Sequence, residues 1–185
     1  MEKKPRLQEA YEKQVVPALM KELGLTNRNA VPKLEKVSLN VGLKAGLKDP
    51  KFVDAAERTL TKISGQKPVK TLAKKSISNF KIRQGMVVGM MVTLRGRRMY
   101  DFIDKFINVT LPRVRDFQGL PQKSVDARGN MSIGFREFMA FPEIRPEDTD
   151  VMHGLEVTIV TTAGEKAKGL ALLKAVGVPF RENAK

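Results

Sequence analysis

Few side chains in this 185-residue chain are able to carry out nucleophilic or acid–base chemistry. The chain has no cysteine and a single histidine, His153. His153 can in principle act as a general base, but it has no cysteine to activate and no second histidine with which to bind a metal. A structural position, exposed or beside a helix, is therefore favoured. No segment matches a phosphate-binding Gly-Lys-Ser/Thr loop or a dinucleotide-binding Gly-x-Gly-x-x-Gly turn. We expect no enzyme, no catalytic residue and no cofactor.

Two other groups of side chains could in principle bind a cation. Carboxylates gather in "PEIRPEDTD", residues 142–150. A solvated acidic turn is favoured over a cation site, because the acids stand beside prolines or at turn positions and lack metal-loop spacing. Met86, Met90 and Met91 fit the core and the surface of a sheet better than a soft-metal site. We therefore expect no metal site.

The residues with the clearest chemistry are cations. From Arg58 to Tyr100 the chain holds eleven of its 34 lysines and arginines and none of its 20 acids, so 23 bases and 20 acids remain elsewhere. Inside this window, "KSISNFKIRQG" places three cations around one aromatic residue. Lysine-rich loops are often only solvated, but solubility requires no block of a single sign. Together with the net charge of +14, this indicates an anionic partner, with nucleic acid ahead of an anionic membrane surface.

The composition predicts one soluble domain over residues 1–185. A hydrophobic content of 42% suffices for a core at this length. The lack of cysteine fits a reducing cytoplasm, and the N-terminus "MEKKPRLQEAYEKQ" has no apolar signal region. No run approaches the roughly 18 apolar residues that span a bilayer. We expect a cytoplasmic protein with no membrane partner.

Periodicity predicts the elements that position these cations. An N-terminal helical segment within residues 1–24 is interrupted or kinked at Pro17, and a second helix is capped by Asp49, carries Pro50 in its first turn and stops at Gly65. The remaining predicted strands are at 36–42, 87–95 and 154–163, and helical stripes are predicted at 99–107 and 165–176. A basic loop is predicted at 74–85, and an irregular excursion at 111–145 contains one strand at 131–135. The pattern predicts an α+β fold, a mostly antiparallel sheet with helices packed on one face and a long basic loop.

Apart from Met91, the outward positions of the predicted strands are small, polar or basic, and none is aromatic. They are Ser38, Asn40, Gly42, Gly89, Met91, Thr93, Arg95, Thr158 and Thr162. A sheet that stacks single-stranded bases would need aromatic residues there, whereas small polar groups permit close approach of a folded RNA. An ordinary solvated sheet face is the alternative.

Several motifs resemble one known family. They are "LNVG" (39–42), "SGQKP" (64–68), "KKSISNFKIRQG" (74–85), "VTLRG" (92–96), "LPRVRDFQGL" (111–120), "FPEI" (141–144) and the "TTA" that closes the last strand. Their order resembles that of bacterial protein five of the large ribosomal subunit, the 5S rRNA-binding L-five family, over about residues 15–180. The resemblance implies a non-enzymatic protein of the central protuberance that binds 5S rRNA. Implied partners are large-subunit rRNA, P-site tRNA, a small-subunit head protein and other central-protuberance proteins.

The resemblance also implies roles for particular residues. Those implied to bind 5S rRNA are Asn40, Gln66 and Thr93, with Ser38 and Arg95 beside them on the outward side of the strands. Those implied to face tRNA are Lys74, Lys75, Phe80, Lys81 and Arg83, with Phe80 either a stacking group or a loop anchor. The chain departs from the family pattern at Val125, Ala127 and Met131, in the region to which the small-subunit contact is assigned.

Two other functions remain open at this point. A free-standing RNA chaperone or regulator would use the same basic surface without belonging to a ribosome. A peripheral membrane protein would need a basic amphipathic helix, whereas the cations here concentrate in a loop.

Overall fold

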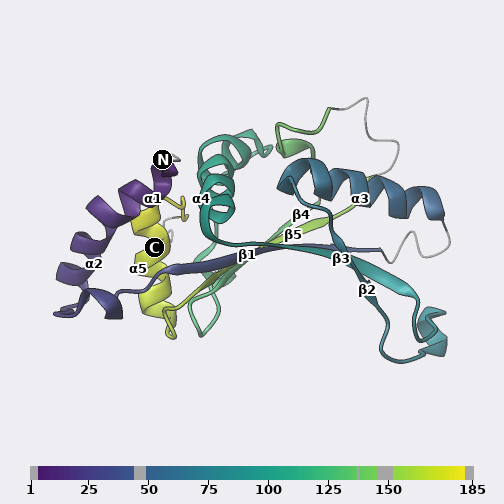
Figure 1. The fold of residues 1–185 in the computed structure, drawn as a ribbon, viewed down its shortest axis with the longest axis horizontal. Coiled ribbons are helices and arrows are strands. Elements are labelled where there is room, and N and C mark those ends of the chain that lie inside the picture. Colours follow the sequence, from purple (N-terminus) through teal and green to yellow (C-terminus); the bar gives the residue numbers. More distant parts are fainter. Residues whose placement is uncertain (1–3, 44–48, 137, 146–151, 182–185) are drawn as a thin grey trace. The chain divides into compact units, whose positions relative to one another are not determined.

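The fold is built on one antiparallel sheet of five strands. A computed structural model describes residues 4–43, 49–136, 138–145 and 152–181. Its strands are β1 (Leu34–Gly42), β2 (Val69–Leu72), β3 (Val87–Leu94), β4 (Met131–Phe135) and β5 (Leu155–Thr161). They lie in the order β2-β3-β1-β5-β4 (Figure 1). The predicted α+β class is confirmed.

Residue contacts divide the chain into two compact units, each of which contains parts of the strands. Unit 1 comprises Met1–Val37, Leu94–Ile133 and Thr158–Lys185, and unit 2 comprises Ser38–Thr93 and Gly134–Val157. The sequence predicts a single domain, and that remains a prediction.

Helices dominate unit 1. Its N-terminal segment consists of α1 (Arg6–Ala10), a π-helical turn (Tyr11–Val15) and α2 (Val16–Glu22). The π turn stands directly before the turn that holds Pro17, whose ring nitrogen has no hydrogen to donate. The unit also holds α4 (Gly96–Lys105), with a further π turn (Phe106–Thr110), and α5 (Lys166–Val176). Helix α1 packs on α4, and α5 packs on α2, which buries Leu19, Phe106 and Leu172.

Unit 2 places helix α3 (Pro50–Ser64) against strands β1 and β3 (Figure 1). The three predicted helix signals are confirmed. Asp49 Oδ1 accepts a hydrogen bond from the Lys51 amide at 2.9 Å, and Pro50 lies in the first turn. Gly65 takes φ +66° and donates its amide to the Thr61 carbonyl at 2.8 Å. Phe52, Ala56, Leu60 and Ile63 form the buried side of the helix.

Strand β2 is an element that the sequence pattern did not predict. It pairs antiparallel with β3, with Val69 opposite Met91, Lys70 opposite Met90 and Thr71 opposite Gly89. The predicted basic loop is therefore the end of a β-hairpin. The Leu43 amide bonds the Val88 carbonyl at 3.0 Å, so the part of the hairpin that precedes β3 extends past the end of β1 (Figure 1).

The predicted excursion at 111–145 contains β4 and three short 3₁₀ turns, at Leu111–Arg113, Gln122–Ser124 and Phe138–Ala140. The predicted strand at 131–135 coincides with β4. Glu147, Asp148 and Asp150 of the predicted acidic turn lie outside the described residues.

Candidate nucleic-acid interface

The side of unit 2 that faces away from α3 is the first candidate surface, and we call it the outer face. Alternation along β1 buries Val37, Leu39 and Val41 and leaves Ser38 half-buried and Asn40 exposed. Alternation along β3 likewise buries Met90 and Val92 and leaves Thr93 half-buried. The outer face consists of Ser38, Asn40, Gly42, Val69, Thr71, Gly89, Met91 and Thr93.

Gly89 shows how closely the strands of the outer face approach one another. A Cβ atom built on Gly89 would lie 2.8 Å from Thr71 Oγ1, 3.0 Å from the Val41 carbonyl oxygen and 4.0 Å from Asn40 Oδ1. Gly89 was predicted to be an open outward position, but the structure shows it buried. The cause is strand β2, which brings Thr71 over it. The structure therefore groups Asn40 with Thr71, a polar residue that the sequence pattern did not single out.

Gln66 and Arg95 lie outside the strands that form the outer face. Gln66 lies in the turn between α3 and β2, where its amide bonds Ser64 Oγ at 3.1 Å. Its side chain is half-buried, and its joint action with Asn40 and Thr93 remains a prediction. Arg95 stands at the start of α4 in unit 1, with Nη1 at 3.7 Å from Glu35 Oε1. Both side chains of that pair are exposed, so the pair contributes little to stability and leaves the Arg95 charge at the surface.

The basic loop is the second candidate surface. Its four predicted phosphate-binding side chains, Lys74, Lys75, Lys81 and Arg83, are all exposed. The loop has defined backbone structure, because Ile77 and Ile82 exchange hydrogen bonds of 2.9 and 3.2 Å. Further bonds run from the Gln84 amide to Ser76 Oγ at 3.0 Å and from the Gly85 amide to the Ala73 carbonyl at 3.0 Å.

Phe80 lies at the tip of this hairpin, in a 3₁₀ turn (Ser78–Phe80). Its side chain is 58% exposed. Lys81 follows in the left-handed region at φ +54°, which turns the chain back toward Ile82. Both interpretations of Phe80, as a stacking group and as a loop anchor, remain predictions.

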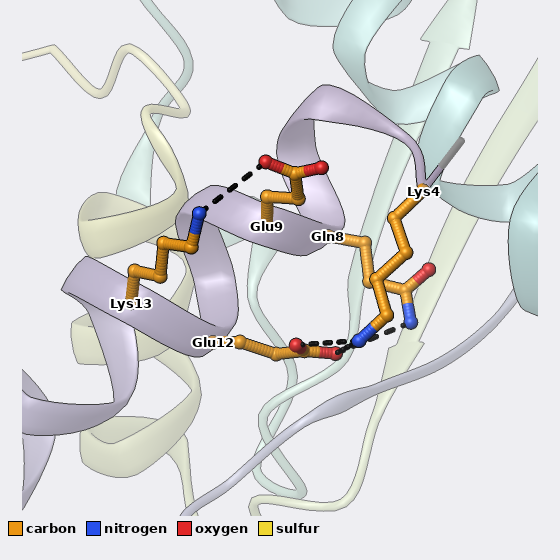
Figure 2. A network of polar contacts seen from close by, with 5 residues as sticks. All are labelled: Lys4, Gln8, Glu9, Glu12 and Lys13. Atoms are coloured by element: carbon orange, nitrogen blue, oxygen red, sulfur yellow. Dashed lines mark hydrogen bonds and ion pairs between the residues drawn. The ribbon is translucent and has the colours of Figure 1, made fainter.

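The N-terminal helices provide an electrostatic contrast, because their charges are largely compensated within the chain. Lys4 Nζ donates to both carboxylate oxygens of Glu12, at 3.1 and 2.9 Å, and Lys13 Nζ lies 3.5 Å from Glu9 (Figure 2). The bond from Lys4 lowers the pKa of Glu12. Gln8 Nε2 also donates to Glu12, at 3.4 Å. Residues 58–100, which include the hairpin, contain no acid that could compensate their cations in the same way.

His153 is a buried structural residue. Its ring stacks on Phe138 with centroids 4.3 Å apart and meets Phe52 edge-on at 6.3 Å. Burial lowers the pKa of His153, and the nearby Gly154 carbonyl opposes that shift. The position beside α3 agrees with the predicted structural role, but the side chain is not exposed. The sequence does not reveal this environment, because Phe52 is distant along the chain.

The described residues contain neither a cluster of metal-binding side chains nor a helix that could span a membrane. No group of three or more His, Asp or Glu side chains within them is arranged to hold a metal ion. None of the helices in the described ranges is long and apolar enough to cross a membrane. Met90 is fully buried in the core, and Met91 lies on the outer face.

Fold and surface together define a basic α+β protein whose uncompensated cations face outward from one hairpin. Comparison with known families is specific: residues 27–83 match the model of "Ribosomal protein L5", and residues 87–180 match that of "ribosomal L5P family C-terminus". The chain belongs to the ribosomal protein L5 family. It is accordingly a ribosomal protein and not an enzyme, as predicted.

Individual relatives are similar over nearly their whole length. The "Large ribosomal subunit protein uL5" of Herpetosiphon aurantiacus is 55% identical over 177 residues, which cover 96% of this chain and 99% of that protein. The proteins of the same name from Carboxydothermus hydrogenoformans and Cupriavidus metallidurans are each 52% identical over 176 residues, covering 95% of this chain and 98% of each relative.

Proposed function

We propose that this chain is a 5S rRNA-binding protein of the central protuberance, which also contacts P-site tRNA and helps to bridge to the head of the small subunit. Its family membership makes it a structural constituent of the large ribosomal subunit, located in the bacterial cytoplasm. The 5S rRNA, tRNA and small-subunit contacts are our proposal. Large-subunit rRNA and neighbouring proteins of the central protuberance are proposed as further partners.

The observation that carries the proposal is the composition of the outer face. Asn40, Thr71 and Thr93 offer amide and hydroxyl groups, and Gly89 adds no side chain between Asn40 and Thr71. Folded RNA presents 2′-hydroxyls and phosphates in a wide, shallow minor groove, which such groups can bond at close range. The neighbouring cations add affinity that does not depend on sequence.

The basic loop supports a separate contact with tRNA. Its cations lie beyond the end of β1, at a different place in unit 2 from Asn40 and Thr93. Because the hairpin is closed by its own hydrogen bonds, the four charges are held at the tip before any partner binds. Such charges position a nucleic-acid backbone without reading its bases. The bridge to the small subunit rests on the family resemblance of the chain as a whole, because residues 124–138, to which that contact is assigned, depart from the family pattern at Val125, Ala127 and Met131.

The 5S contact is tested by truncating Asn40, Gln66 and Thr93 to alanine one at a time. Each change should weaken 5S rRNA binding by about 1–3 kcal/mol, because a buried partner on the RNA is left without its hydrogen bond. Asn29→Ala is the matched control, since Asn29 is exposed on a turn of unit 1. Unchanged affinity in all three folded variants would count decisively against the proposal.

A free-standing RNA chaperone would make the same contacts, so binding alone does not separate the two functions. A ribosomal constituent should remain on large subunits that have been washed at high salt, and a chaperone should be released. Detection of the chain in the washed subunits, with a known loosely bound factor as the control, decides between them.

The tRNA contact is tested by a fourfold alanine variant of Lys74, Lys75, Lys81 and Arg83. Exposed substitutions of this kind seldom cost more than about 0.5 kcal/mol of stability each, so the protein should fold and keep most 5S rRNA affinity. Retention of P-site tRNA on reconstituted ribosomes should fall, and the deficit should shrink as salt screens the wild-type contacts. A control with the same loss of charge replaces four exposed lysines outside the loop, Lys21, Lys51, Lys123 and Lys174. A large loss of 5S rRNA affinity with normal tRNA retention would mean that the loop binds 5S rRNA and not tRNA.

A further inference from the structure

An apolar pair interrupts the polar character of the outer face. Val69 of β2 and Met91 of β3 are directly opposite each other in the strand register. Their side chains are 65% and 39% exposed, respectively. They are among the most exposed large apolar residues in the described chain, and they lie side by side.

The strand pairing fixes the side of the sheet on which this pair lies. Neighbouring Lys70 points to the opposite side, where its Nζ lies 3.0 Å from Glu57 Oε2 of α3. Its register partner Met90 is fully buried on that side. Val69 and Met91 are therefore on the side not covered by α3, one step along the strands from Thr71 and Gly89.

The pair does nothing for the core, and threonine at either position would serve the strand equally well. Adjoining exposed apolar residues on an otherwise polar face can mark a binding site. The surroundings restrict the partner, because the same hairpin carries the exposed cations Lys74, Lys75, Lys81 and Arg83. Such a surface does not favour a protein partner of ordinary mixed charge. It favours a polyanion that also has apolar groups to contact.

We infer that Val69 and Met91 form an apolar contact with ribose rings of the folded rRNA bound on the outer face. This inference rests on the proposed function and extends it to the means by which the face discriminates RNA from other polyanions. The carbon faces of the riboses line the shallow minor groove of an A-form helix, within reach of a flat surface. The unbranched thioether of Met91 adapts to their contour, while Val69 supplies a rigid neighbour. The contact is uncharged, so its contribution persists at salt concentrations that weaken the phosphate contacts.

The test replaces the pair by near-isosteric polar residues, Val69→Thr together with Met91→Gln. Affinity for a 5S rRNA transcript is measured at several salt concentrations, beside an unrelated RNA duplex of equal length. We expect an affinity for 5S rRNA about tenfold lower at every salt concentration, with an unchanged slope of log affinity against log salt. Arg95→Gln removes a cation from the residues implied to bind 5S rRNA and is expected to give a shallower slope.

Two control variants separate apolarity from shape and from general effects. Val69→Ile with Met91→Leu keeps the surface apolar and should retain wild-type affinity. Val109→Thr changes a 39% exposed valine in unit 1 and should also have no effect. Urea unfolding of each variant verifies that it is folded before its affinity is compared.

Each remaining outcome overturns a specific statement. Wild-type 5S affinity in the polar variant would overturn the ribose contact and leave the proposed function intact. Equal losses in the polar and apolar variants would show that shape, and not apolarity, is recognised. Normal 5S affinity combined with poor incorporation into large subunits would assign the pair to a protein partner instead. Lack of preference of the wild-type protein for 5S rRNA over the duplex would refute the proposed function itself.

Discussion

Replacing Gly89 by alanine tests the geometry of the outer face. The new Cβ would lie 2.8 Å from Thr71 Oγ1 and 3.0 Å from the Val41 carbonyl oxygen, whereas ordinary van der Waals contacts are 3.4–4 Å. Thr71 can rotate away, but the carbonyl belongs to the backbone of β1 and is fixed by the sheet. Overpacking of this kind costs about 1–3 kcal/mol. The loss of glycine flexibility in the unfolded chain returns about 0.4–1 kcal/mol. The net expectation is a destabilisation of about 1–2 kcal/mol.

The assay is urea unfolding, in which the midpoint should fall while the dependence on denaturant stays constant. Gly42→Ala is the matched control, because its Cβ would meet nothing within 4 Å on the same face. That variant should be as stable as the wild type or slightly more stable. Adding Thr71→Ala to the Gly89 variant should recover the part of the loss that is due to the hydroxyl. Equal stability of the Gly89 and Gly42 variants would refute the packing described for β1, β2 and β3.

Three further changes have defined outcomes. Burial lowers the pKa of His153, so as the pH falls the unfolded chain binds a proton at this residue before the folded chain does. The stability of the fold should therefore decrease as the pH drops below about 6.5. His153→Phe should remove this pH dependence from urea midpoints measured from pH 5 to 8. Burial raises the pKa of Tyr11 to about 12, so stability should decline as pH rises through 10 to 12. Tyr11→Phe should reduce this decline in thermal melts, with the remainder due in part to Tyr100, whose pKa burial also raises. The change should cost about 1 kcal/mol at neutral pH, since the hydroxyl donates to the Pro32 carbonyl at 2.9 Å. Gly169→Ala should cost about 3 kcal/mol or more in urea unfolding, because its Cβ would collide with the Gly129 backbone.

Strands and helices with one buried side were predictable from the sequence. In β1 the buried Val37, Leu39 and Val41 alternate with Ser38 and Asn40, so only one assignment of faces is possible. Helix α3 was equally clear, because its first and last turns carry residues that satisfy the backbone groups at a helix end.

Strand β2 could not be predicted, because its residues are mostly exposed. Val69 and Leu72 are apolar, but neither is buried. Pairing with β3, and not a hydrophobic face of its own, makes this segment a strand. The sequence pattern did not predict that Thr71 covers Gly89 for the same reason. The environment of His153 depends likewise on Phe52 and Phe138, which only the tertiary fold brings to it.

The candidate site was predictable in its residue types and less so in its arrangement. The exposure of Asn40 and the partial exposure of Thr93 agree with the prediction. The basic loop was expected from its charges, but its closure into a hairpin depends on backbone bonds that leave no residue pattern. Gln66 lies in a turn outside the strands. The alternation of residues along a strand therefore could not predict how far Gln66 lies from Asn40 and Thr93.

The position of β2 in the sheet affects how readily the protein aggregates before it is assembled into the ribosome. As the first strand in the sheet order, β2 has a neighbouring strand on one side only within the described chain. Its free edge, with Val69 and Leu72 exposed beside it, is a template on which a second copy could add a strand. The exposed Lys67, just before β2, opposes such pairing by charge repulsion, a protection that weakens as salt rises. If this chain is synthesised faster than the rRNA it assembles with, the excess protein is therefore prone to aggregation. This gives a physical reason to balance the synthesis of the protein with that of the rRNA.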